Sequence, residues 1–369
     1  MAGPMTEFHG RLVDCDSHLY LTPAQLPDAV GPDFARRFIR LQETTFGPRD
    51  VAGEAARVTM DVDSVWRVKG WQAGAAYDAG LRVQTLNLMG VDRQVLFPDG
   101  LFASVTTSRM PGAPEAASRY NDYVLDWSAA GNGRLRPMAI LHMRDVAAAI
   151  SEAERTISRG AYGFYLSCAA PPAGMAPANP AWDRLWALLA EARVPAFLHV
   201  GSESGFLDKA WGAIPGPGGA PELGPFSLAT NQIGPQVYLT ALILGGVFER
   251  HPGLRMGITE FTAQWVGPLA EMLDQRVAAC GHEMSRFLSL KPSEYLSRQL
   301  RVTPFYWEPV DTYIDRYGLA DVYAFSTDFP HTEGGEDPVD QFRGRIGRLG
   351  ADVSQKFFVG NGALLCPDR

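Results

Sequence analysis

The stretch that decides the fold of this chain is Val13-Asp14-Cys15-Asp16-Ser17-His18-Leu19-Tyr20. Its apolar start predicts a short strand, and Thr22-Pro23 then turns the chain away. Because alternate side chains of a strand point to the same side, we expect Asp16 and His18 to face one side together. A carboxylate and an imidazole that converge at a strand end are a common beginning of a divalent-metal site. Taken alone, the pair is better explained by a turn cap and a buried histidine.

Further strand-like runs follow this first one, and they alternate with stretches that carry helical signals. Eight strands that alternate with helices are what a (β/α)8 barrel requires, so we predict one α/β TIM barrel over residues 1–369. A doubly wound open sheet is the alternative, but no glycine-rich phosphate loop follows the first strand. The expected strands are Leu12–His18, Val91–Pro98, Leu135–His142, Tyr162–Ser167, Val194–Val200, Leu254–Glu260, Leu300–Tyr306 and Val322–Asp328.

Two long segments interrupt the alternation: residues 23–88 follow the first strand, and residues 201–234 follow the fifth. Inside the second segment, Ile214-Pro215-Gly216-Pro217-Gly218-Gly219 can form neither helix nor strand. Loops that follow the strands of a barrel surround its catalytic mouth. We therefore expect both insertions to lie over the active-site mouth, as a lid or as a wall for the substrate.

Composition excludes several classes of protein. The chain of 369 residues carries a net charge of −8 and has no run rich in lysine or arginine, which argues against a nucleic-acid partner. No apolar stretch approaches the roughly 18 residues that a membrane-spanning helix needs. The start of the chain lacks the features of a signal peptide, and the four scattered cysteines fit reduced thiols. We expect a cytoplasmic protein with a small-molecule substrate.

Three later strands are expected to end in residues that bind metals. The fifth ends at His199, the sixth at Glu260 and the eighth at Asp328, with His331 three residues further on. The C-terminal ends of all strands of a parallel barrel lie on one rim, so these residues should converge with the first-strand pair. Three carboxylates and three imidazoles are enough for one crowded site or for two ions, because carboxylates can bridge two metals.

These residues resemble the amidohydrolase superfamily, in the amidohydrolase-related branch that includes aminocarboxymuconate-semialdehyde decarboxylase and the resorcylate decarboxylases. The resemblance implies a (β/α)8 barrel, with Asp16, His18, His199 and Asp328 in the family's metal-ligand positions. The motifs that carry it are Asp14-Cys15-Asp16-Ser17-His18, Phe197-Leu198-His199, Gly246-Val247-Phe248-Glu249-Arg250-His251-Pro252-Gly253-Leu254, Ser326-Thr327-Asp328-Phe329-Pro330-His331 and Phe358-Val359-Gly360-Asn361-Gly362-Ala363.

The chain departs from the decarboxylase pattern at two strand ends. Its first strand carries Asp-x-His where many members have His-x-His, and its sixth strand ends in Glu260-Phe261 where the decarboxylases have His-Gly. The histidine of that His-Gly helps to activate the metal-bound water in the family. No lysine closes the fourth strand at Tyr165-Leu166-Ser167, so a carbamylated lysine that bridges two metals is not expected.

Two mechanisms follow from these residues. In the first, the four family ligands hold one Zn²⁺ or Mn²⁺, and Glu260, if burial raises its pKa, moves protons during hydrolysis or non-oxidative decarboxylation of a small, carboxylate-bearing substrate. In the second, Glu260 and His331 join as ligands of two Fe or Mn ions, and the site activates O₂. A few amidohydrolase-like monooxygenases are similar in this respect, and the chain could be one of them or a subunit of one.

A third hypothesis is not enzymatic: the chain could be a metal-binding accessory subunit of an active homologue. A homo-oligomer, or a hetero-oligomer with a homologous subunit, is expected from the resemblance. We assign Glu260, Asp328 and His331 as the catalytic candidates. Glu203, Arg301 and Tyr306 are weaker candidates for contacts with the substrate, Arg301 because an acidic protein needs a local cation to hold a carboxylate.

Overall fold

The computed structural model describes residues 7–46, 58, 60–98, 104–201, 207–215 and 225–368. Its strands are short, and every strand pairing is parallel. In chain order they are β1 Leu12–Asp14, β2 His18–Leu19, β3 Val91–Pro98, β4 Leu135–Pro137, β5 Ala139–Ile140, β6 Phe164–Leu166, β7 Ala196–His199, β8 Met256–Thr259 and β9 Leu300–Val302.

Two of the eight expected barrel strands are each divided into a pair of short strands. The first becomes β1 and β2, which both pair with β3, and the third becomes β4 and β5 on either side of Met138. At this break the backbone changes partner: Met138 N donates to Leu96 O at 2.8 Å, and the following residue donates to Gly163 O at 2.9 Å. β5 to β9 then run in sequence order, so consecutive strands are neighbours around the barrel.

The eighth expected strand closes the barrel through single bridges and hydrogen bonds. Tyr323 bridges to Val302 of β9, and Phe329 bridges to Ser17, which links the last run to the first. Asp328 N donates to Asp16 O at 2.8 Å across the same seam. The closed ring of parallel strands confirms the predicted (β/α)8 barrel and excludes the open sheet.

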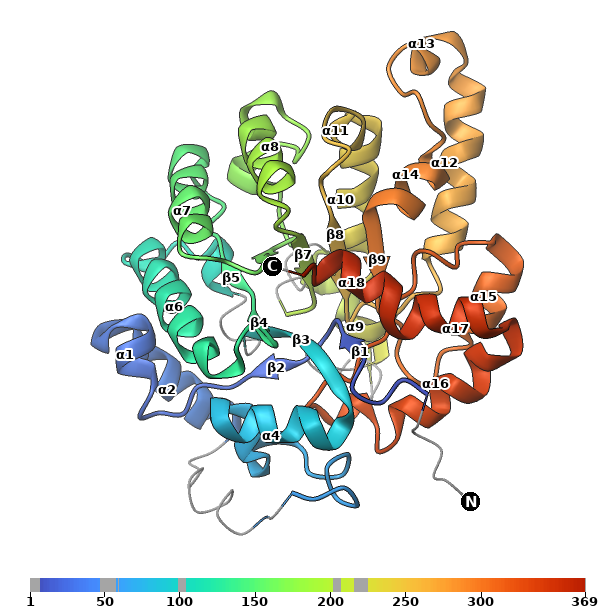
Figure 1. Ribbon diagram of the computed structural model, residues 1–369. Helices are drawn as coiled ribbons and strands as arrows, with labels where there is room; N and C mark the ends of the chain where they lie inside the picture. The colour runs from blue at the N-terminus through green and yellow to red at the C-terminus, as the bar shows by residue number, and fades with distance from the viewer. Residues whose placement is uncertain are drawn as a thin grey trace.

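An outer layer of helices surrounds the strands (Figure 1). The sequence carries helical signals without a break from Gln236 to Arg250, but the structure divides this stretch at Gly245-Gly246, where Gly246 has a φ of 70°. The helices are α1 Leu26–Val30, α2 Pro32–Phe46, α4 Ala79–Met89, α6 Ala113–Ser128, α7 Val146–Ser158, α8 Asp183–Ala192, α9 Pro225–Thr230, α10 Ile233–Leu244, α11 Val247–Arg250, α12 Val266–Cys280, α13 His282–Ser285, α14 Pro292–Gln299, α15 Val310–Tyr317, α16 Pro338–Ile346, α17 Ala351–Gln355 and α18 Asn361–Leu365. Short 3₁₀ or π turns are η1 Gly70–Gln72, η2 Gly74–Ala76, η3 Ser104–Thr107, η4 Ala129–Gly131, η5 Pro172–Gly174, η6 Pro180–Trp182, η8 Lys209–Gly212, η10 Thr332–Gly334, η11 Gly347–Leu349 and η12 Lys356–Gly360.

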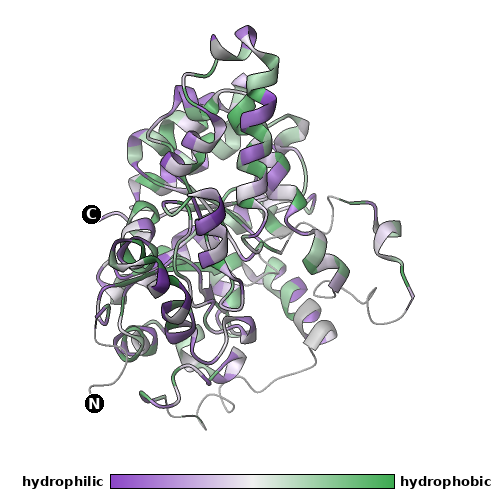
Figure 2. Cartoon of the chain, turned by 90° about the vertical axis from the view of Figure 1, so that its right-hand side faces the viewer, coloured by the Kyte–Doolittle hydropathy of each residue, from purple (hydrophilic) through white to green (hydrophobic). Residues whose placement is uncertain are grey.

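The helices bury one side against the barrel and expose the other. α8 buries Leu185, Trp186 and Leu189, which recur at helical spacing. The long α12 carries hydrophilic and hydrophobic residues side by side along its ribbon (Figure 2). Its first half packs on the barrel, whereas its second half and α13 project outward. No helix in the described ranges is long and apolar enough to cross a membrane.

The first insertion contains regular structure and meets the rim of the barrel. α1 and α2 lie within residues 23–88, and α4 begins there and ends at Met89, although the sequence predicts no helix in this segment. Gly70 N donates to Pro330 O at 2.8 Å, and Tyr20 N donates to Ala76 O at 2.8 Å. Residues 70–76 therefore lie beside the ends of the first and eighth strands, where the metal-ligand candidates are. Of the second insertion, residues 202–206 and 216–224 lie outside the described ranges.

Candidate metal centre

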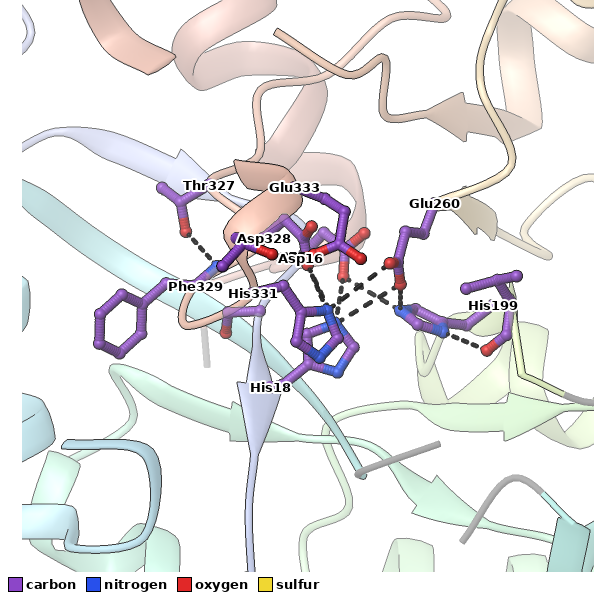
Figure 3. A network of polar contacts seen from close by, with 12 residues as sticks. Asp16, His18, His199, Glu260, Thr327, Asp328, Phe329, His331 and Glu333 are labelled. Carbon is purple, nitrogen blue, oxygen red and sulfur yellow. Dashed lines mark hydrogen bonds and ion pairs between the residues drawn. The ribbon is translucent and has the colours of Figure 1, made fainter. Parts of the chain in front are cut away.

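Six side chains with metal-binding atoms meet where the barrel strands end (Figure 3). His18 lies in β2, and His199 is the last residue of β7. Glu260 directly follows β8. The other three lie on the seam that closes the barrel: Asp16 between β1 and β2, Asp328 at the end of the eighth run, and His331 in the loop behind it. All six residues that the sequence placed on this rim are therefore together.

The donors are close to one another without forming good hydrogen bonds. His18 Nε2 lies 3.2 Å from Asp328 Oδ1, 3.6 Å from Glu260 Oε2 and 3.8 Å from Asp16 Oδ1. His199 Nε2 lies 3.0 Å from Glu260 Oε2 and 3.3 Å from Asp16 Oδ1. His331 Nδ1 lies 2.9 Å from Asp328 Oδ1 and 3.6 Å from Glu260 Oε1.

Burial makes this arrangement unusual for a protein without a bound ion. His18 is 1% exposed and both of its ring nitrogens lack a hydrogen-bond partner, as do Asp328 Oδ1 and Oδ2 and Glu260 Oε2. A buried polar atom without a partner costs about 1–3 kcal/mol, and more if it is charged. His18 Nε2 lies 3.2 Å from Asp328 Oδ1 and 3.6 Å from Glu260 Oε2, so a divalent cation between these three atoms can satisfy them together. The residues therefore fit a metal ion.

Electrostatics support this interpretation. Burial lowers the pKa of His199, but the carboxylates of Asp16 and Glu260 outweigh burial and hold that pKa well above its ordinary value. Burial raises the pKa of Glu260, yet the three adjacent imidazoles of His18, His199 and His331 hold it well below its ordinary value. Burial raises the pKa of Asp16 to about 6. The carboxylates thus give the site a negative potential. This potential stabilises a proton on His199, and it would equally stabilise a bound metal cation.

Contacts outside the cluster orient the imidazole of His199, and ring stacking orients those of His18 and His331. His199 Nδ1 lies 2.7 Å from Val200 O, which identifies Nδ1 as the protonated nitrogen and leaves the Nε2 lone pair to face the centre. The rings of His18 and His331 stack with their centroids 3.7 Å apart. This stack fixes His331 beside the first strand although it comes from a loop.

Glu260 and Asp328 are delivered by backbone that L-amino acids rarely adopt. Their φ angles are 62° and 50°, in the left-handed region. Each residue comes directly after extended chain, so the turn swings its carboxylate into the mouth. A non-glycine residue in this region costs about 1–3 kcal/mol and usually marks a functional site.

A buried network behind the donors holds the first strand in place. Asp14 accepts hydrogen bonds from Thr327 N at 2.9 Å, from Thr327 Oγ1 at 2.5 Å and from Gln94 Nε2 at 2.6 Å. Arg82, which is fully buried, donates to Gln94 Oε1 at 2.7 Å and to the carbonyl oxygen of His18 at 3.2 Å. The network thus joins the first strand, which carries Asp16 and His18, to the eighth run, which carries Asp328. The sequence did not single out Asp14, because a lone aspartate in a strand has no signal of its own.

A small cavity opens beside the donors. Its volume is about 10 Å³, which is about the space of one water molecule. Asp16, Glu260, Asp328 and Tyr306 are among the residues that line it. Tyr306, a substrate candidate from the sequence, therefore lies beside the same small cavity as three of the donors.

The other two substrate candidates are not brought to this place. Arg301 Nη1 donates to Ser297 O at 2.9 Å and to Leu300 O at 2.6 Å, at the beginning of β9 and thus at the opposite end of the barrel from the donors. Glu203 lies outside the described residues.

Lys69 is a cation near the mouth that the sequence did not single out. Its Nζ is buried and has no hydrogen-bond partner among the described residues. Burial lowers the pKa of Lys69 to about 8, although Asp328 and Glu333 oppose the shift. The adjacent residue, Gly70, is hydrogen-bonded to Pro330. No motif marks a lysine inside a long insertion, so only the fold places it here.

Comparison with known proteins gives a family and a fold. The sequence model of the amidohydrolase family matches residues 13–363, so the chain belongs to the amidohydrolase family. A search of the curated proteins gives no match. The (β/α)8 barrel that the sequence predicted agrees with this assignment.

Solved structures share the fold at low sequence identity. An amidohydrolase from Mycobacterium avium subsp. paratuberculosis is 20% identical with a TM-score of 0.66, over 81% of this chain and 76% of that one. The 5-carboxyvanillate decarboxylase of Novosphingobium aromaticivorans, solved with manganese and a nitrobenzoic acid, is 18% identical with a TM-score of 0.67 over 98% of both chains. A dihydroxybenzoic acid decarboxylase from Polaromonas, solved with manganese and 2-nitroresorcinol, is 20% identical with a TM-score of 0.64 over 96% of both.

Proposed function

We propose that this chain is a metal-dependent enzyme that hydrolyses or non-oxidatively decarboxylates a small, carboxylate-bearing organic substrate. The observation that carries the proposal is the convergence of six donors, five of them buried and His331 half-buried, with facing atoms that lack hydrogen-bond partners. The family assignment supports it, and so do the manganese-bound decarboxylases of the same fold. A divalent ion fits the donors, and their mixture of imidazole and carboxylate suits Zn²⁺, Mn²⁺ or Fe²⁺.

The donors would hold the ion, and the residues around them would arrange the reaction. A bound divalent ion polarises a carbonyl or carboxylate oxygen and lowers the pKa of a bound water toward about 7. Glu260 lies within the same cluster, and the histidines hold its pKa well below its ordinary value. It therefore stays a carboxylate and would bind the ion or accept a hydrogen bond from water or substrate rather than act as a strong base. Tyr306 lines the cavity and can donate a hydrogen bond to a substrate oxygen.

The substrate is proposed to carry a carboxylate because the mouth holds an unpaired buried cation. Lys69 Nζ has no partner among the described residues, and leaving an ammonium group buried and unpaired is costly. A carboxylate that binds between the metal and Lys69 would pair this charge. The sequence suggested Arg301 as the cation that pairs with the substrate carboxylate, and we propose Lys69 for this role instead.

The direct test compares the chain with variants that lack a donor. We expect Asp328→Asn and His199→Ala to lower kcat by more than about 100-fold, because each removes a ligand of the ion. His282→Ala, which changes an exposed histidine far from the cluster, should keep full activity. The assay follows release of CO₂ from aromatic carboxylic acids and hydrolysis of their esters, amides and lactones. Equal activity of all variants would contradict the proposal.

The charge of Lys69 gives a second prediction. We expect Lys69→Met to raise KM for an anionic substrate by about 10-fold or more with a smaller change in kcat, because the carboxylate loses its ionic partner. Lys69→Arg should recover part of the affinity. An unchanged KM in Lys69→Met would show that the substrate carboxylate binds elsewhere.

The other hypotheses from the sequence are tested by the same preparation. An accessory subunit would be inactive alone and would gain turnover only with a homologous partner. Association with copies of itself, and the cytoplasmic location, stay predictions. The O₂-activating alternative has no support from the family or from the similar structures, and we do not adopt it.

A further inference from the structure

A second cavity lies at the opposite end of the barrel from the metal-ligand candidates. Its volume is about 430 Å³, within the range of about 300–1,000 Å³ that is usual for sites of small ligands. It lies beside the first residues of β3, β4 and β6, and because the strands are parallel these starts are far from the strand ends that carry the donors. Its charged lining consists of Asp92, Arg93, Arg134, Arg136, Arg159 and Asp368.

Two of the four arginines in this lining already have carboxylate partners. Arg93 contacts Asp92, with Nε 2.9 Å from Oδ2, and it also contacts Asp368. Arg159 contacts two aspartates of α6. The lining as a whole holds four arginines against two aspartates, so it carries an excess of two positive charges.

Arg134 makes its contacts with neutral oxygen atoms. Its guanidinium donates to Val91 O at 2.8 Å, to Asp92 O at 2.9 Å and to Asn87 Oδ1 at 2.8 Å. Each terminal nitrogen of an arginine carries two N–H groups, and these bonds use one on each. Arg134 is therefore held in place by the start of β3 and keeps N–H groups for a further acceptor.

Arg136 is the more buried of these two arginines, at 4% exposed. It donates from Nε to Gly133 O at 2.9 Å and from Nη1 to Pro367 O at 2.6 Å, and its guanidinium lies 5.3 Å from the centroid of the Tyr162 ring. No carboxylate in the described part of the chain forms an ion pair with it. Burial lowers the pKa of Arg136, and the charge of Arg93 adds to this effect. A guanidinium buried without an anion is costly, so this side chain favours an anionic ligand.

We propose that this cavity binds a small organic phosphate as its dianion, held by Arg134 and Arg136. A dianion matches the excess of two positive charges in the lining, and the planar fork of a guanidinium matches two oxygens of a phosphate group. The cavity is larger than a phosphate group alone needs, so it has room for an organic part. This site is separate from the metal centre and from the substrate position proposed there.

A purely structural role for the arginines makes a different prediction. Arg93 contacts Asp368 and Arg136 donates to Pro367 O, so both join the last described residues of the chain to the barrel. If the arginines served only as this anchor, their loss would lower stability and the cavity would bind no phosphate. Binding of a phosphate by the wild type therefore distinguishes the two roles.

Equilibrium dialysis of the full-length protein against phenyl phosphate tests the proposal, with inorganic phosphate as a competitor. We expect one phenyl phosphate to bind per chain and inorganic phosphate to displace it. This binding should remain in Lys69→Met and after treatment with a chelator, because both changes act at the metal centre. It should therefore persist even if the metal-enzyme proposal fails. Absence of binding, or binding that these two changes abolish, would overturn the proposal.

Variants of the lining test which charges hold the phosphate. Arg134→Gln and Arg136→Met are each expected to weaken binding by about 10-fold or more, because each removes a charged hydrogen-bond donor. Asp92→Asn is expected to tighten binding by about 3-fold or more, because it removes a negative charge beside the ligand. The Asp92 side chain is 43% exposed, so this substitution changes the charge without disturbing the core. Arg276→Gln, at an exposed position of α12, is the matched control and should bind as the wild type does. Unchanged affinity in Asp92→Asn and in the arginine variants that fold would contradict the assignment.

Discussion

Glu260 and Asp328 show how single residues prepare the centre. Both have a left-handed backbone, at φ angles of 62° and 50°, and both are almost fully buried. A protein keeps such residues only where the surrounding contacts determine their conformation. For Asp328 those contacts include the hydrogen bond from its N–H to Asp16 O. The carboxylates are thus positioned by the fold before any ion arrives, which reduces the cost of binding one.

Gly334 lets the loop behind Asp328 pack against the last strand. A Cβ at this position would lie 2.0 Å from Thr327 O and 3.3 Å from Asp328 Cβ. We therefore expect Gly334→Ala to displace the loop and to weaken metal binding by about 10-fold or more, the size of effect known for supporting residues of metal sites. Titration of the metal-free protein with Mn²⁺ measures this change.

Gly344 provides the matched control for that substitution. It lies in α16, and a Cβ there meets nothing within 4 Å. Gly344→Ala should leave metal affinity unchanged and stabilise the helix by about 0.5–1 kcal/mol. Equal metal affinity in both variants would show that the close packing at Gly334 does not position the ligands.

The six donors could be predicted from the sequence because each ends a recognisable strand or follows one closely. His199 and Glu260 directly terminate apolar runs, and the parallel barrel brings such ends together. Asp14 and Lys69 could not be found in this way. Asp14 is the last residue of β1, two residues before Asp16, and only its hydrogen bond from Gln94, which in turn accepts from Arg82, shows that it holds the first strand in place. Lys69 is a candidate contact for the substrate only because its ammonium group is buried near the donors, and the residues beside it in the sequence do not predict this burial.

At the scale of elements, Glu308 connects the loops that follow β8 and β9. Its carboxylate accepts hydrogen bonds from Ala263 N and Phe305 N, both at 2.8 Å. Burial raises the pKa of Glu308 to about 7 despite these bonds. Because Glu260 lies just before Ala263, this connection also supports the rim that carries a metal ligand.

The raised pKa of Glu308 predicts a loss of stability as the pH rises. The folded state holds a proton that the unfolded state releases near pH 4.5, so the contribution is fully present below that pH and is lost as the pH rises through about 7. The difference amounts to about 3 kcal/mol at most. Glu308→Gln removes this titration. Urea unfolding at pH 5 and pH 8 should show a larger decrease for the wild type than for the variant, and equal decreases would contradict the prediction.

The order and type of the elements could be predicted from periodicity, but their boundaries could not. Gly245-Gly246 divides a stretch that reads as one helix, because Gly246 adopts a left-handed φ that ends α10 and begins α11. The helices α1, α2 and α4 inside the first insertion were also missed. This segment interrupts the alternation of strands and helices, so its position does not predict them, although Asp78 caps α4 by accepting a hydrogen bond from Leu81 N.

At the scale of the whole molecule, the barrel converts distant sequence positions into one site. Asp16 and Asp328 are separated by most of the chain, yet a backbone hydrogen bond of 2.8 Å joins them across the closing seam. The hydrophobic core runs continuously from Phe8 to Cys366 beneath this rim. A rigid core of this kind holds carboxylates close together that would separate in a flexible chain. A bound cation relieves the repulsion between these carboxylates, and this relief favours its binding.

The central claim is that the six donors bind divalent metal, and anomalous X-ray diffraction from crystals of the purified protein tests it most directly. Data are collected on both sides of the absorption edge of the metal found by elemental analysis. We predict strong anomalous peaks between His199 and His331, within about 2.0–2.3 Å of their facing nitrogens. Crystals of metal-supplemented protein that give no anomalous peak at these donors, or peaks only elsewhere, would contradict the account.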